Sequence, residues 1–125
     1  MTVLIDSDIL IEVSRGRNAG IVAIWIDLSN SDAAVLYSPV SVAELWAGAR
    51  PKEYRALENL FRALTCTPID EGSGRQAGDY LRQYRRSHGV EVADALIATG
   101  AVGNGAQLWT RNRKRYPMKE VAFFD

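Results

Sequence analysis

The chain has 125 residues, of which 47% are hydrophobic and 24% are charged, and 15 Lys and Arg balance 15 Asp and Glu. These values are typical of one globular domain covering residues 1–125, and they exclude a polycation that coats nucleic acid and an acidic disordered tail. The single cysteine excludes a disulfide framework and a multi-cysteine zinc site. No apolar run is long enough to cross a membrane, and acidic residues come early, so we expect a cytoplasmic protein without a membrane segment or signal peptide.

Short apolar runs and helical patterns alternate along the chain. The run at 3–5 predicts a buried strand, followed by a helix that Ser7 or Asp8 caps and Gly16 ends. Further helices are predicted at 21–28, from 41 to the 48–51 region, and at 54–64, 73–87 and 93–102. Further strands are predicted at 35–37, 65–69, 107–109 and 121–123. This alternation indicates an α/β domain of three layers, with a central parallel sheet flanked by helices.

Three acidic residues far apart in the sequence are expected to meet at one edge of this sheet. Asp6 directly follows the first strand, Glu44 lies in the first turn of the helix after the second, and Asp94 begins the helix before strand 107–109. Open parallel sheets bind ligands at the carboxyl ends of their strands. Clustered carboxylates repel each other unless a cation neutralises them, and oxygen ligands without clustered His or Cys favour Mg²⁺ or Mn²⁺. Such a site polarises a phosphodiester and activates a water molecule.

Each of these residues also has a plain structural role that the sequence alone leaves open. Asp6 is placed to cap the helix after the strand, and the spacing of Ser41 and Glu44 is that of a capping box. Asp94 would gain from the helix dipole in the first turn. However, Asp94 shares a helical face with apolar residues, and burying a carboxylate without a partner is costly, which favours a functional role.

Four segments in this order resemble the motifs of the PIN-domain ribonucleases, specifically the VapC-type toxins of prokaryotic toxin–antitoxin pairs. VLIDSDILIE is similar to the first motif, with a metal-binding Asp6, and SVAELWAGAR to the second, with a catalytic Glu44. HGVEVADALIATGA is similar to the third motif, with a metal-binding Asp94. LWTRNRKRYP resembles the closing motif, in which Thr110 and Asn112 fit the polar positions. The resemblance covers nearly the whole chain and implies one PIN domain.

The resemblance implies Mg²⁺- or Mn²⁺-dependent endonucleolytic cleavage of RNA, with a metal-activated water as the nucleophile. It also implies a cognate VapB-type antitoxin that blocks the site, and assembly as a homodimer or as a hetero-oligomer with that antitoxin. A basic cluster follows the fourth strand and is predicted to hold RNA phosphates, with Arg111, Arg113, Lys114 and Arg115 as its members.

The closing segment departs from the family pattern in one respect. Many PIN domains have a fourth carboxylate there, whereas residues 107–119 contain none. Asn112 ligates weakly through its carbonyl oxygen and adds no charge. Asp8 is placed either to substitute for the missing acid or to cap the first helix. The sequence therefore leaves open whether one or two metal ions bind.

Two other functions stay open at this point. Asp6-Ser7-Asp8 after an apolar strand also matches the start of the haloacid-dehalogenase-like phosphatases, in which Asp6 would be the covalent nucleophile and Asp8 the acid–base residue. The paired late acids of that chemistry are missing, which ranks this alternative below the nuclease. The missing fourth carboxylate is the motive for the second alternative, a catalytically degenerate PIN module that binds RNA or protein without cutting it.

Overall fold

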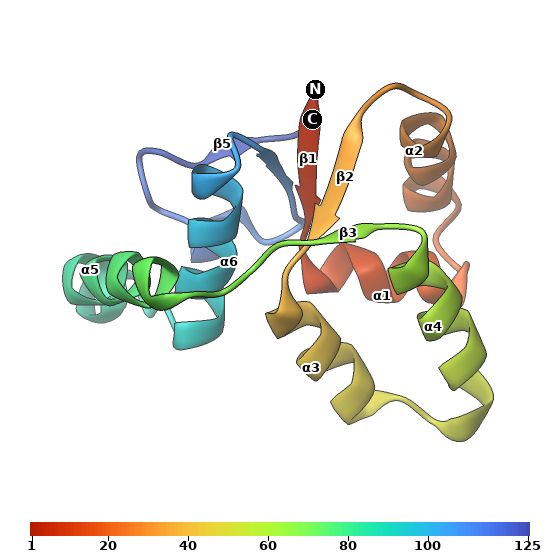
Figure 1. Cartoon of the computed structure of the whole chain (residues 1–125), viewed down its shortest axis with the longest axis horizontal. Coiled ribbons are helices and arrows are strands. Elements are labelled where there is room, and N and C mark those ends of the chain that lie inside the picture. Colours follow the sequence, from red (N-terminus) through yellow and green to blue (C-terminus); the bar gives the residue numbers. More distant parts are fainter.

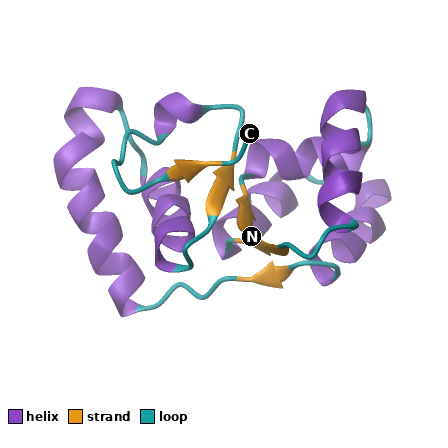
Figure 2. Ribbon diagram, turned by 90° about the horizontal axis from the view of Figure 1, so that it is seen from above, coloured by secondary structure: helices purple, strands orange, loops and turns teal.

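The computed structural model describes residues 1–125 as a five-stranded sheet with helices on both sides (Figures 1 and 2). None of the helices combines the length and the apolar character that a membrane crossing needs. The elements in chain order are β1 (Thr2–Ile5), α1 (Ser7–Arg15), α2 (Ala19–Ser29), β2 (Ala34–Tyr37), α3 (Pro39–Gly48), η1 (Pro51–Glu53), α4 (Tyr54–Arg62), β3 (Thr65–Cys66), α5 (Glu71–His88), α6 (Val92–Gly103), β4 (Gln107–Trp109), η2 (Arg113–Arg115) and β5 (Ala122–Phe123).

The sheet is entirely parallel, with strand order β3-β2-β1-β4-β5. In the central strand β1, Leu4 pairs with Leu36 of β2 on one side and with Leu108 of β4 on the other. The chain leaves β1 toward β2 and β3, and later crosses back to β4 and β5. The segments after β1 and β4 therefore diverge, and this divergence is where open α/β sheets bind ligands.

Residues of β1 alternate between two hydrophobic clusters, one on each face of the sheet. Val3 and Ile5 pack with apolar residues of α1, α2, α3 and α4, whereas Leu4 packs with those of α5 and α6. All three side chains are fully buried. Burial on both faces explains why the sequence of this strand is a continuous apolar run. The predicted three-layer α/β/α architecture is confirmed.

Every predicted strand and helix is present, and its ends differ from the prediction by at most three residues, but predicted caps of two helices are wrong. Of the three candidate caps of α1, Ser7 and Asp8 are wrong and Asp6 is correct, because Asp6 keeps the extended backbone of the strand and accepts a hydrogen bond from Ser7 N. Helix α3 begins at Pro39 behind the N-cap Ser38, so that Ser41 lies inside the helix and forms no capping box. Proline favours this earlier start because its fixed φ suits the first helical position.

Candidate active site at the carboxyl edge of the sheet

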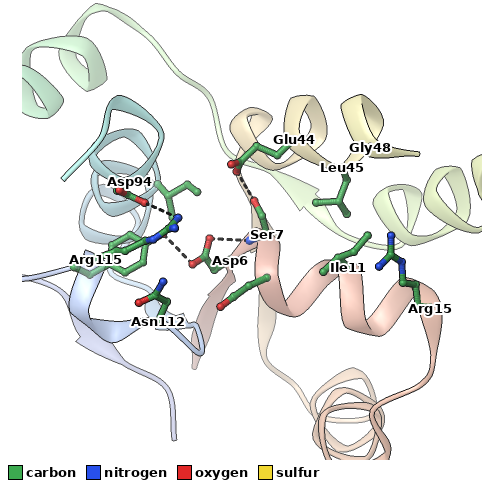
Figure 3. Close-up of a pocket in the computed structure, with 13 residues that line it drawn as sticks. Asp6, Ser7, Ile11, Arg15, Glu44, Leu45, Gly48, Asp94, Asn112 and Arg115 are labelled. Carbon is green, nitrogen blue, oxygen red and sulfur yellow. Dashed lines mark hydrogen bonds and ion pairs between the residues drawn. The ribbon is translucent and has the colours of Figure 1, made fainter. Parts of the chain in front are cut away.

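A cavity of about 400 Å³ opens where the chain leaves β1 and β4. Figure 3 shows Asp6 after β1, Glu44 on α3 and Asp94 on α6, all around this cavity. Asp8 and Asn112 line it as well. The structure therefore brings the three predicted acids together with Asp8, the candidate fourth acid, from three segments that are distant in the sequence.

Asp6 is held rigidly by three hydrogen bonds. Its Oδ1 accepts from Ser7 N at 2.7 Å, which caps α1. Its Oδ2 accepts from the hydroxyls of Thr110 at 2.8 Å and Tyr116 at 2.9 Å. The Asp6 side chain is buried, so these donors stabilise the carboxylate in place of water. Asp6 thus has both its structural role as a cap and a fixed position at the cavity.

Asp94 divides its two oxygens between the helix and the cavity. Oδ2 accepts from the backbone amide of Glu91 at 3.0 Å and completes a capping box at the start of α6. Oδ1 lies 3.8 Å from Nη1 of Arg115. Burial raises the pKa of Asp94, while the Glu91 amide and Arg115 act in the opposite direction. Asp94 therefore has both expected features: it completes the cap of α6, and it is a carboxylate buried on the apolar face of that helix.

Glu44 is oriented by the serine that follows Asp6. Oγ of Ser7 lies 2.7 Å from Oε1 of Glu44 and 2.7 Å from Oγ of Ser41. Because a carboxylate only accepts, Ser7 donates its hydroxyl proton to Glu44 and accepts from Ser41. The exposed Glu44 is thereby linked to the end of β1, although it belongs to another helix.

Asp8 has a buried oxygen without a partner. Its Oδ2 accepts from the backbone amide of Arg111 at 3.0 Å, whereas its Oδ1 has no hydrogen-bond partner. Burial raises the pKa of Asp8, and the nearby Asp6 carboxylate raises it further. An unpaired buried carboxylate oxygen carries a large desolvation cost that a cation would offset.

The donors around this cavity fit a hard divalent cation in their chemistry. They comprise carboxylate oxygens and the side-chain amide of Asn112, with no histidine or cysteine among them, as Mg²⁺ and Mn²⁺ prefer. No group of three His, Cys, Asp or Glu side chains is arranged to hold one ion in this structure. The acids therefore share a cavity, but the expected close grip of three carboxylates on one ion is not formed in this arrangement.

Three of the four predicted phosphate-binding side chains already contact acidic groups of the protein. The ion pairs join Arg111 to Glu12 at 3.7 Å, Arg113 to Asp125, and Arg115 to Asp94 at 3.8 Å. Of the four, only Lys114 has no acidic partner, and only Arg115 lines the cavity. RNA binding by this cluster stays a prediction, and the structure shows that most of its charge is compensated.

The sequence model of the PIN domain family matches residues 3–123. The chain belongs to the PIN domain family. Two curated relatives come from Mycobacterium tuberculosis. Ribonuclease VapC10 is 39% identical over 119 residues, covering 94% of this chain and 88% of the relative, and ribonuclease VapC19 is 37% identical over 116 residues, covering 92% of each. The assignment from sequence motifs to this family and its VapC-type members is confirmed.

Solved structures share the fold of this PIN domain. One is VapBC2 from Rickettsia felis bound to a promoter DNA fragment, with a TM-score of 0.82, 18% identity, and coverage of 99% of this chain and 98% of that one. Another is VapBC-1 from nontypeable Haemophilus influenzae, with a TM-score of 0.79, 22% identity, and coverage of 100% and 98%. At these identities the likeness shows the fold alone.

Two residues, Ser7 and Tyr116, orient the acids of this PIN domain in a way that the sequence analysis did not predict. The sequence predicts only a capping role for Ser7, although its place between Asp6 and Asp8 marks it as a neighbour of the site. Tyr116 gave no signal, because a lone tyrosine in a loop does not reveal where its hydroxyl points. Arg115 was expected to hold RNA phosphates, and in the structure it faces Asp94.

Proposed function

We propose that this PIN domain is a Mg²⁺- or Mn²⁺-dependent endoribonuclease and the toxin of a VapBC-type pair. The observation that carries the proposal is the cavity around which four carboxylates gather, one of them with a buried oxygen that lacks a partner. The relatives named ribonuclease VapC10 and ribonuclease VapC19 support RNA as the substrate.

The metal would be held by Asp6, Asp8, Glu44 and Asp94, with Asn112 as a weaker neutral donor. A divalent cation bound there would lower the pKa of a water molecule and polarise the phosphodiester. Glu44, which Ser7 holds at the rim, accepts the proton of the attacking water. Thr110 and Tyr116 fix the position of Asp6 by donating hydrogen bonds to Oδ2.

The partner that we propose is a VapB-type antitoxin that covers this cavity. Several solved structures with this fold are described as VapBC or toxin–antitoxin complexes, which supports such a partner. Assembly as a homodimer or as a hetero-oligomer with the antitoxin, and a cytoplasmic location, stay predictions.

The two alternative functions are less well supported. In a haloacid-dehalogenase-like phosphatase Asp6 would attack phosphorus, yet both of its oxygens accept hydrogen bonds and no lysine lines the cavity. A degenerate PIN module was motivated by the missing fourth acid. Asp8, at the start of α1, lines the same cavity and supplies a fourth carboxylate in place of the one that the closing segment 107–119 lacks. Its presence favours the catalytic function.

A cleavage assay with controlled metal content tests the proposal. The purified chain should cleave single-stranded RNA with Mg²⁺ or Mn²⁺, lose this activity in EDTA, and regain it when the metal is restored. Sequencing of the 5′ ends formed after induced expression would then identify the target. Equal cleavage in EDTA would contradict the metal requirement, and binding without cleavage in any metal would support the degenerate module.

The role of Ser7 gives a more specific prediction. Ser7→Ala removes the hydrogen bond that orients Glu44, and we expect kcat for RNA cleavage to fall about tenfold, as for other residues that orient a metal-site carboxylate. Ser7→Thr, which keeps the hydroxyl, should restore most of the rate. The matched control is Ser29→Ala, because Ser29 bonds only to the carbonyl of Trp25 in its own helix. If the kcat of Ser7→Ala equals that of Ser29→Ala, Ser7 does not position Glu44.

A further inference from the structure

A second cavity, of about 340 Å³, lies at the C-terminal end of α1 and the start of η1. Four basic residues line it, namely Arg15, Arg17, Arg50 and Lys52, and we call them the α1 basic cluster. Glu53 is the one acidic residue in the lining. The cavity thus has a formal charge of +3, from four positive charges and one negative charge.

Glu53 holds two of these arginines side by side. Its Oε2 lies 3.5 Å from Nε of Arg15 and its Oε1 lies 3.5 Å from Nε of Arg50. Oε1 also accepts from the backbone amide of Arg50 at 3.0 Å. Neither Arg17 nor Lys52 forms an ion pair, and both are exposed. The cluster therefore has a braced pair of guanidinium groups and two free cations, an arrangement suited to phosphate groups.

The α1 basic cluster adjoins the candidate active site, because Arg15 lines both cavities. Figure 3 shows Ser7, Ile11 and Arg15 in turn along α1, leading away from the acids. Nine residue steps separate Asp6 from Arg15, or roughly 13 Å at the helical rise of about 1.5 Å per residue. This length matches about four nucleotides at a rise of about 3.4 Å, and fewer in an extended strand.

We propose that the α1 basic cluster binds backbone phosphates of the RNA strand a few nucleotides away from the bond that is cut. The proposal rests on the proposed ribonuclease function. It differs from the sequence-based expectation, which placed RNA phosphates on the basic segment after β4. Three of the four residues in that segment are each paired with a separate acid of the protein. In the α1 basic cluster, Arg15 and Arg50 share the single carboxylate of Glu53, and Arg17 and Lys52 form no ion pair.

The double variant Arg17→Gln/Lys52→Gln tests this subsite, because it removes the two free cations and leaves the braced pair intact. Binding is measured by fluorescence anisotropy with a labelled mixed-sequence RNA dodecamer in EDTA, where no cleavage is expected. We expect Kd at low salt to rise about tenfold. The plot of the logarithm of the association constant against log[NaCl] has a negative slope, and we expect its magnitude to decrease by about 1.4, since each phosphate contact on a single strand contributes about 0.7. A dinucleotide, too short to span both cavities, should bind both proteins equally.

The matched control is Arg62→Gln/Arg75→Gln, which removes the same net charge from exposed residues outside both cavities. If the control variant weakens dodecamer binding as much as the test variant does, the proposed subsite is wrong. RNA cleavage by the wild-type protein would still support the proposed ribonuclease function in that case. A wild-type protein that neither binds nor cleaves RNA overturns both. If a poly-glutamate peptide distinguishes the two variants and the dodecamer does not, the cluster serves an acidic protein segment and the RNA subsite is wrong.

Discussion

Replacing Asp94 by asparagine should lower the rate of RNA cleavage by more than about 100-fold and leave the free energy of unfolding nearly unchanged. The loss of even an outer-sphere partner of a metal site costs about 10- to 100-fold, and Asp94 is placed to act directly. The fold should tolerate the change, because the asparagine carbonyl still accepts from the Glu91 amide and a buried negative charge disappears. The exposed Arg115 loses a partner that contributes little to stability.

This result is measured as initial rates on a fluorogenic RNA with Mn²⁺, together with urea unfolding of each protein. Asp32→Asn is the matched control, since it makes the same chemical change at an exposed residue outside the cavity. Equal cleavage by Asp94→Asn and the wild type would show that a contaminating nuclease is responsible, and would return the chain to the degenerate binding module.

The fold was predictable because its strands and helices differ in pattern. The apolar run at 3–5 belongs to a strand buried on both faces, and the periodic residues of α4 are the buried Leu57, Leu60 and Phe61. In a parallel sheet, the order of these elements places Asp6, Glu44 and Asp94 at one edge. The convergence of the acids therefore followed from topology and required no knowledge of side-chain contacts.

The contacts that fix the acids were not predictable in the same way. The Thr110 and Tyr116 hydroxyls reach Asp6 across more than a hundred residues of sequence, and such a contact has no local pattern. The pairing of Arg115 with Asp94 depends on how the loop after β4 folds back over the sheet. The earlier start of α3 depends on Pro39, and it moved Ser41 from a cap to a partner of Ser7. These features arise in tertiary packing, after the secondary structure has formed.

The Asp6→Ala variant should lose stability as well as activity. Asp6 caps α1 and accepts from two further donors, Thr110 and Tyr116, in a buried setting. Loss of an N-cap costs about 1 kcal/mol, and each buried donor left without a partner costs about 1–3 kcal/mol. We therefore expect the free energy of unfolding to fall by at least about 3 kcal/mol, a large part of the roughly 5–15 kcal/mol that is typical of a domain. Urea unfolding measures this loss directly.

This expectation changes how growth experiments with Asp6 variants are interpreted. Relief of growth arrest by Asp6→Ala would arise from lost catalysis or from a smaller amount of folded toxin, because a loss of this size alters abundance in cells. Asp6→Asn separates the two effects, since its carbonyl oxygen still caps α1 while the negative charge is removed. Asp6→Asn should abolish cleavage with about half the loss of stability.

If Asp6→Ala unfolds at the same urea concentration as the wild type, the hydrogen bonds to Asp6 do not support the fold. Persistent growth arrest with Asp6→Asn at normal abundance would show that Asp6 has no catalytic role.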